Sequence, residues 1–117
     1  HYFIETDGGE YMKINSLSEQ TFYILLSLLS EPLHGYGIIK KVEVMSNGNI
    51  VLAAGTLYGA IDNLKKSKLI EQLKTEDISK RKVYKLTEDG LDILMKEYDR
   101  LKQLCKIAEY TIEKREE

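Results

Sequence analysis

Apolar residues recur at helical spacing in three stretches of the first two thirds of the chain. Residues 18–30, SEQTFYILLSLLS, predict a first helix that Ser18 caps and that Pro32 keeps from continuing. The second half of this helix is apolar on nearly every side, so we expect it to be covered by a second element or a second subunit. Residues 35–48 predict a shorter helix that ends at Gly48, where glycine accepts the left-handed conformation.

The third helical stretch, residues 54–67, carries two glycines in its first two turns. Its inward positions follow helical spacing and are Leu57, Ala60, Ile61 and Leu64. Gly55 and Gly59 lie on the opposite face, and each is less favourable than alanine inside a helix by roughly 0.5–1 kcal/mol. The preceding residues 49–52 are too few for more than a short strand or an extended connector. Helix stability therefore does not explain the two glycines.

Two short runs with alternating apolar and polar residues come next. They are LIEQLKT at 69–75 and VYKL at 83–86, and the charged loop EDISKRK at 76–82 lies between them. This arrangement predicts a two-stranded hairpin with a basic loop.

A long amphipathic helix is predicted from its cap, Thr87, nearly to the C-terminus. Its apolar seam advances by steps of three and four residues and consists of Leu91, Leu94, Tyr98, Leu101, Cys105, Ala108 and Ile112. A helix of about 28 residues is about 42 Å long, more than a core this small can cover. We therefore expect the seam to pair with a second copy of the chain. Packing of the seam on its own domain alone is the alternative.

The charged residues are unevenly distributed along the chain. The net formal charge of the chain is −2, yet residues 36–86 carry ten Lys and Arg against five Asp and Glu, a net +5. Residues 1–35 and 87–117 carry −4 and −3. The positive charge is therefore concentrated around the glycine-containing helix and the hairpin.

Cysteine content and hydropathy narrow the class of protein further. The single cysteine, Cys105, excludes an intrachain disulfide and a multi-cysteine zinc site, and it predicts a cytoplasmic location. No apolar run approaches the roughly 18 residues that a membrane span requires. Residues 1–11, HYFIETDGGEY, share no periodicity with the residues after Met12. We interpret them as a leader added for expression, with a native N-terminal arm as the alternative.

Together these elements predict a mainly α fold. Three short helices and a basic hairpin form a winged helix-turn-helix domain at residues 12–86, and a C-terminal dimerisation helix follows at 87–117. The segments HGYGIIKKVE, GTLYGAIDNLKKSKLIE and KRKVYKLTEDG resemble the PadR family of bacterial transcription regulators, over about residues 18–112. The single C-terminal helix is similar to that of the short subfamily. The resemblance implies a DNA-binding regulator that acts as a homodimer.

The chain departs from the family pattern at three places. Ala53 and Ala54 stand where the family usually has a capping Ser or Asn and often a Pro. Gly59 stands where members often have Pro, and Ser79 is nearest to the glycine expected at the tip of the hairpin. The resemblance therefore concerns the fold more than its fine geometry.

As a recognition helix, the third helix would bring its glycine face to DNA. Gly55 and Gly59 would let the backbone approach bases and phosphates, and the hairpin cations would contact phosphates. Asp62 either accepts from a cytosine amino group or pairs with a lysine. The expected DNA-binding residues are Tyr36, Gly55, Thr56, Tyr58, Gly59, Asn63, Lys66, Lys80, Arg81 and Lys82. Two alternatives stay open: the glycines mark only a loose helical turn, and the basic loop is only solvated.

The resemblance also implies a ligand site at the dimer centre, where members of the short subfamily bind flat aromatic or drug-like compounds. Its wall would be drawn from Tyr98, Leu101 and Cys105, with parts of residues 22–29. Leu101 stands where a relative can carry a stacking Trp, and this chain has no Trp. Core packing is the alternative role of these residues.

The predicted function is a homodimeric repressor that binds a palindromic operator in double-stranded DNA and is released by a small aromatic or drug-like effector. A winged-helix module that binds an acidic protein instead of DNA is the alternative. An enzyme, a cofactor and a metal are not expected, because no phosphate-binding loop, metal-ligand spacing or nucleophile constellation occurs. His34 is expected to make a local hydrogen bond or to touch a phosphate. No membrane partner is expected.

Overall fold

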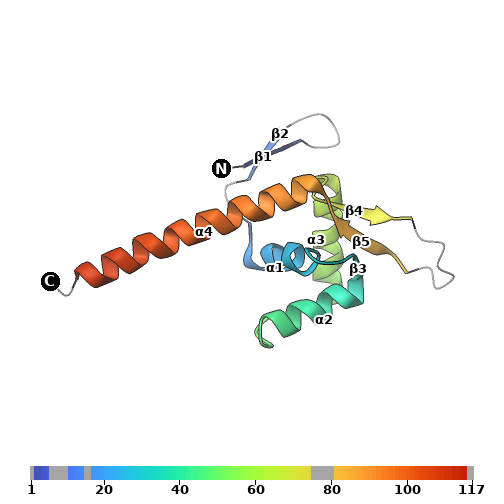
Figure 1. Cartoon of the computed structure of the whole chain (residues 1–117). Coiled ribbons are helices and arrows are strands. Elements are labelled where there is room, and N and C mark those ends of the chain that lie inside the picture. Colours follow the sequence, from blue (N-terminus) through green and yellow to red (C-terminus); the bar gives the residue numbers. More distant parts are fainter. Residues whose placement is uncertain (1, 6–10, 15–16, 75–80, 116–117) are drawn as a thin grey trace.

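A computed structural model describes residues 2–5, 11–14, 17–74 and 81–115 of the chain. Short helices and a small sheet form a domain from which one long helix projects (Figure 1). The elements in chain order are β1 (Tyr2–Glu5), β2 (Tyr11–Ile14), α1 (Glu19–Ser27), β3 (Leu33–His34), α2 (Gly35–Met45), α3 (Ala54–Lys66), β4 (Ile70–Leu73), β5 (Val83–Leu86) and α4 (Glu88–Lys114).

The first predicted helix is confirmed as α1, with an earlier end. Its cap is Ser18, whose side-chain oxygen accepts a hydrogen bond from the Thr21 amide at 3.1 Å. The helix ends at Ser27 rather than at Ser30, because a bend already turns the chain before Pro32.

The second and third predicted helices are also confirmed, although α2 ends at Met45 and not at the predicted Gly48. After α2 the chain turns at Gly48, which has a φ of +80° and donates its amide to the Glu43 carbonyl at 2.8 Å. α3 begins after Ala53 without a side-chain cap, as predicted. Its inward residues Leu57, Ile61 and Leu64 are buried and Ala60 is partly buried. Residues 49–52 form a connector and no strand.

The predicted hairpin is β4 and β5, which we call the wing. It is antiparallel, with Leu73 opposite Val83. The structure adds β3, which pairs with β5 and places Leu33 opposite Tyr84, so the sheet has three strands in the order β3-β5-β4. β3 is not predicted from the sequence, because two residues are too few to show an alternating pattern. The connection at 75–80, including Lys80 and Ser79, lies outside the described residues.

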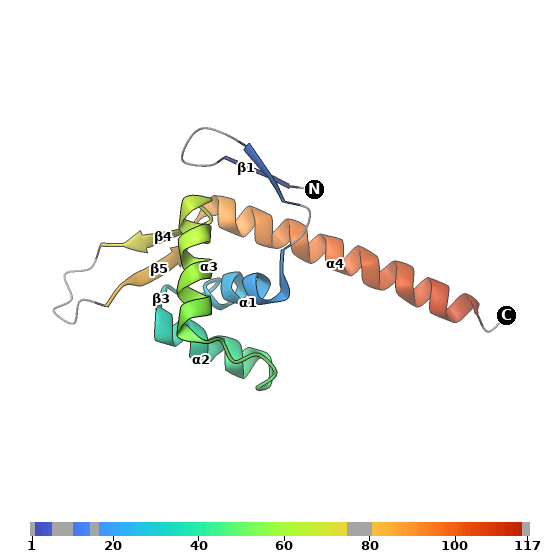
Figure 2. The same ribbon diagram turned by 180° about the vertical axis from the view of Figure 1, so that it is seen from behind.

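The N-terminal residues contain an element that the sequence analysis does not predict. β1 and β2 pair antiparallel, with Tyr2 opposite Ile14. In Figures 1 and 2 this hairpin lies on the other side of α4 from α1 and α2. The interpretation of residues 1–11 as a leader stays a prediction, as do the domain boundaries.

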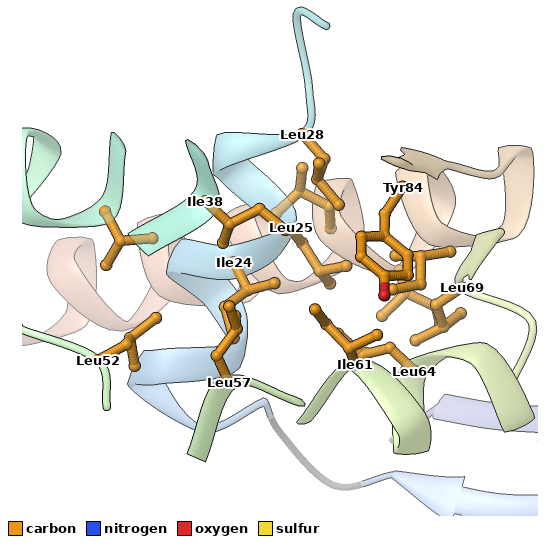
Figure 3. Packing of buried hydrophobic residues seen from close by; sticks show 14 residues of the cluster. Ile24, Leu25, Leu28, Ile38, Leu52, Leu57, Ile61, Leu64, Leu69 and Tyr84 are labelled. Atoms are coloured by element: carbon orange, nitrogen blue, oxygen red, sulfur yellow. The ribbon is translucent and has the colours of Figure 1, made fainter. Parts of the chain in front are cut away.

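The hydrophobic core is built around α1, which packs against both α2 and α4. Figure 3 shows Ile24 and Leu25 of α1 surrounded by Ile38 of α2, Leu57 of α3 and Tyr84 of β5. Coverage by more than one element explains why the sequence of this helix is apolar on nearly every side.

The first turn of α4 is held against the end of α3 and the start of the wing. Thr87 caps the helix as predicted, because its side-chain oxygen accepts from the Gly90 amide at 3.0 Å. The same hydroxyl donates to the carbonyl of Lys68 at 2.7 Å. A Cβ on Gly90 would lie 2.0 Å from the carbonyl oxygen of Leu69, so only glycine permits this approach.

A buried carboxylate marks the point where α4 leaves the domain. Glu97 is 1% exposed, and it accepts hydrogen bonds from the amide of Leu17 at 3.2 Å and from Nε of Arg100 at 2.8 Å. Beyond it, every residue from 101 to 115 is exposed in the single chain. Figure 2 shows this part of α4 projecting away from the other helices.

We expect Thr87→Ala to lower the free energy of unfolding by about 1 kcal/mol, because it removes both the helix cap and the bond to Lys68. Thr87→Ser is the matched control, since it keeps the hydroxyl and should retain most of the stability. Urea unfolding monitored by circular dichroism measures both variants. Equal destabilisation by Ser and Ala would show that the methyl group, and not the hydroxyl, holds this junction.

Candidate nucleic-acid interface

One line of residues on the outward face of α3 carries no side chain at its first two positions, Gly55 and Gly59. Gly55, Gly59, Asp62 and Lys66 follow one another at steps of four, three and four residues, so they form a line along the helix. All four are exposed, and a Cβ on either glycine would meet no atom within 4 Å. Tertiary packing therefore does not require the glycines. The line faces outward, while Leu57 on the opposite side of the helix is fully buried.

Tyr58 connects α3 with the start of α2. It is 47% exposed, and its hydroxyl lies so close to Gly35 that a Cβ there would be 2.5 Å from that oxygen. His34 caps α2, because its Nδ1 accepts from the Gly37 amide at 2.9 Å. The local hydrogen bond expected of His34 is thereby confirmed.

Three segments that are distant in sequence meet at one open cavity of about 260 Å³. The start of α2, Tyr58 of α3 and the two residues that precede β5 line it, with residues His34, Gly35, Tyr36, Tyr58, Arg81 and Lys82. Tyr36 is 63% exposed, and Lys40 Nζ lies 5.5 Å from the centre of its ring. The cavity thus combines tyrosine hydroxyls with two cationic side chains, a combination suited to an anionic group such as a phosphate.

Tyr84 of β5 lies beneath this surface and is buried. Burial raises the pKa of Tyr84 above its usual value, and the nearby Tyr58 and Asp62 raise it further. The phenol therefore stays neutral at physiological pH. Its position in Figure 3, beside Ile61 and Leu64, joins the wing to α3.

The structure brings four of the predicted DNA-binding residues together at the cavity: Tyr36, Tyr58, Arg81 and Lys82. The other described ones, Gly55, Thr56, Gly59, Asn63 and Lys66, are exposed along α3. Lys80 lies outside the described residues. The neighbouring Lys65 is engaged by the wing, because its Nζ donates a hydrogen bond to the Gln72 side chain of β4 at 3.2 Å.

The predicted seam of α4 divides into a buried and an exposed part. Leu94 is 1% exposed and belongs to the core of its own chain. The remaining seam residues, Leu91, Tyr98, Leu101, Cys105, Ala108 and Ile112, are exposed. Four further apolar residues of this helix are exposed and were not predicted as part of the seam: Met95, Leu104, Ile107 and Tyr110. These residues lie outside a seam that advances by steps of three and four residues. Their hydrophobicity alone would have identified them as candidates for an interface.

The described part of the chain holds neither a metal-binding cluster nor a membrane-spanning helix. No group of three or more His, Cys, Asp or Glu side chains among these residues could hold a metal ion. None of the described helices is both long enough and apolar enough to span a membrane.

Comparison with known proteins gave one family match and several relatives. The model of the family described as "Transcriptional regulator PadR-like family" matches residues 24–96. The transcriptional regulator YqjI of Escherichia coli (strain K12) is 31% identical over 83 residues, which are 71% of this chain and 39% of the relative. The chain thus spans about two fifths of the length of that relative.

Solved structures share the fold. A PadR family transcription regulator from Clostridium difficile R20291 has a TM-score of 0.69 and 24% identity, over 81% of this chain and 99% of that chain. A structure of BpsR from Bordetella bronchiseptica has a TM-score of 0.63 and 18% identity, over 81% of this chain and 67% of that chain. The BpsR structure is described as showing a mechanism by which 6-hydroxynicotinic acid regulates the DNA binding of BpsR.

We expect Gly59→Ala to raise the free energy of unfolding by roughly 0.5–1 kcal/mol, because the added methyl group meets no atom and the helix backbone loses less entropy. Gly90→Ala should do the opposite and destabilise the fold strongly, since its Cβ would collide with the Leu69 carbonyl. Urea unfolding of both variants is the measurement. If Gly59→Ala also destabilised the fold, residue 59 would have a structural role and its glycine would need no functional reason.

Proposed function

The chain belongs to the PadR-like family of transcriptional regulators, and we propose that it is a homodimeric repressor whose α3 reads a palindromic operator. The members of this family are DNA-binding regulators and not enzymes. Repression would be steric, because a dimer seated on a promoter blocks access to it. The sequence relatives, the exposed surface of α3 and the projecting end of α4 support the finer parts of this proposal.

The proposal depends mainly on the exposed glycines Gly55 and Gly59 on the outward face of α3. The major groove of DNA admits one α-helix, whose N-terminal residues contact the base edges. A helix with glycine at residues 55 and 59 can approach bases and phosphates more closely than one with side chains there. Thr56 and Asn63 flank the line, and their exposed polar groups can form hydrogen bonds with base edges.

The cavity beside α3 would hold the DNA backbone. Arg81 and Lys82 of the wing are exposed cations, and Tyr36 and Tyr58 offer hydroxyl donors from the other side. Contacts with phosphate require charge and reach rather than a particular base, so these residues would set the position of the helix in the groove.

The projecting half of α4 supports the homodimer. Its apolar residues beyond Glu97 are exposed in the single chain, and such a large apolar surface is unusual on a protein without a partner. A second copy of the same helix is the simplest partner, because symmetric pairing covers both copies at once. In a dimer on DNA, the two copies of α3 would enter successive major grooves about 34 Å apart.

An effector would act on the same dimer. Tyr98, Leu101 and Cys105 are exposed on α4 and would line a site for a small aromatic compound between the paired helices. The DNA binding of BpsR is regulated by a small aromatic compound, 6-hydroxynicotinic acid. Release from DNA requires that the compound bind with unequal affinity to the two states of the dimer. Operator titrations repeated with aromatic acids test this step, and unchanged affinity with every such compound would exclude it.

The wing provides the first test of DNA binding. We expect the wild-type protein to bind a duplex from the upstream region of its own gene tightly, against excess non-specific DNA. Combined Arg81→Ala and Lys82→Ala substitutions should weaken binding and reduce the slope of log affinity against log salt by about 0.9 for each phosphate that is no longer neutralised. Fluorescence anisotropy at several salt concentrations measures both quantities.

Two further variants separate the effect of positive charge on DNA binding from the effect of a close approach of α3 to DNA. Lys96→Ala removes an exposed cation of α4 that pairs with Asp92, and it should leave binding nearly unchanged. Gly59→Ala should weaken operator binding with little change in the salt slope, because it adds bulk and no charge. Weak binding that any duplex displaces equally would contradict operator recognition, and it would favour a protein-binding role for the same surface.

The dimer is tested separately in solution. We expect Leu101→Glu to convert the protein to a monomer, because it places a charge in the apolar surface that the second copy covers. Gln103→Glu adds the same charge on the polar side of α4 and should leave the dimer intact. Sedimentation equilibrium reports the mass of each variant. A wild-type monomer, or a Leu101→Glu dimer as stable as the wild type, would contradict the proposed interface.

A further inference from the structure

Asp62 is the first side chain on the outward line of α3 after the two glycines. It is exposed and is the one acidic residue of this helix. Within the described part of the chain, no hydrogen bond or ion pair engages its carboxylate. The nearby cation Lys65 is instead bonded to Gln72 of the wing at 3.2 Å. Among the described residues, Asp62 is thus an unpaired negative charge on the surface proposed to face DNA.

A carboxylate in this position opposes DNA binding unless a base compensates it. The phosphates surrounding the groove repel it, and removal of its water adds a desolvation penalty. Hydrogen-bond donors on the major-groove edges of bases are limited to the N4 amino group of cytosine and the N6 amino group of adenine. Adenine also presents the N7 acceptor beside its amino group, which would repel the second carboxylate oxygen. Cytosine is therefore the base that suits Asp62 best.

The two glycines on the outward line of α3 leave room for Asp62 to contact a base. Aspartate has a short side chain, so it reaches a base edge only from a helix that lies deep in the groove. Gly55 and Gly59 precede Asp62 by about two turns and one turn on the same line, and neither adds a side chain that would hold the helix away.

We propose that Asp62 is a specificity-determining residue that selects a cytosine at one position of each operator half-site and rejects the other bases there. This inference rests on the proposed DNA binding through α3. Asp62 would add little affinity by itself. Its main effect would be discrimination, because every non-cytosine base leaves the carboxylate, which DNA covers in the complex, unpaired or repelled.

The test compares the wild-type protein with Asp62→Asn, which keeps the shape of the side chain and removes its charge. Each protein selects duplexes from a library with random sequence, and the bound duplexes are sequenced. We expect the wild type to enrich a cytosine in one column of each half-site. Replacing that cytosine by thymine should weaken wild-type binding roughly 5- to 150-fold, the range of a good base contact. Asp62→Asn should lose most of this discrimination while binding non-specific DNA as tightly as the wild type or more tightly.

Asp92→Asn is the matched control, because it removes one negative charge from an exposed side chain on α4, away from α3. It should reproduce any general effect of charge without altering the cytosine column. Urea unfolding of both variants checks that the fold is retained.

Three outcomes would overturn the inference. One is an unchanged cytosine column in Asp62→Asn, and another is the absence of any cytosine column in a wild type that does enrich an operator. A third is an equal loss of discrimination in Asp92→Asn, which would make the effect one of net charge. A wild type that enriches no sequence at all would instead overturn the proposed function itself, so the two failures are distinguishable.

Discussion

The architecture depends on the close contact between Gly90 of α4 and the carbonyl oxygen of Leu69. A side chain at residue 90 would collide with that oxygen, so the long helix can start here only because residue 90 is glycine. The Leu69 carbonyl also accepts the Thr87 amide at 3.1 Å, and the Thr87 hydroxyl bonds the Lys68 carbonyl. Backbone contacts therefore hold α4 at the point where α3 passes into the wing. In the proposed dimer, this junction relates the DNA-reading helix to the dimer helix.

The glycines of α3 have a different physical meaning from Gly90. Nothing in the fold occupies the space beside Gly55 and Gly59, and both are less favourable than alanine within a helix. A protein gives up stability in this way mainly where function requires it. A functional reason also fits the neighbouring residues, because Tyr58 of the same helix lines the cavity together with Arg81 and Lys82. The stability of α3 comes instead from its inward residues, which the rest of the domain covers.

The two parts of α4 have different surroundings, although the helix is continuous. Up to Glu97 it belongs to the core, where Leu94 is buried and Glu97 receives the amide of Leu17. Beyond Glu97 its apolar residues continue along the helix and are exposed in the single chain. One helix therefore serves both the domain core and, in the proposed dimer, the partner. In the proposed dimer, this continuous helix would transmit a change in dimer geometry to the winged domain without a flexible hinge.

The sequence by itself determined the helices, the wing hairpin and the caps Ser18 and Thr87, because helical periodicity, strand alternation and capping are local properties of the chain. The three recognisable segments also determined the family. Only the tertiary structure decided which seam residue is buried, that β3 pairs with β5 and that Glu97 accepts a hydrogen bond from the amide of Leu17. The cavity likewise gathers residues from three separate segments, so its existence depends on contacts between positions far apart in sequence. Such contacts leave no local periodicity, and this is why the sequence alone could propose candidate residues of the site but not their arrangement around the cavity.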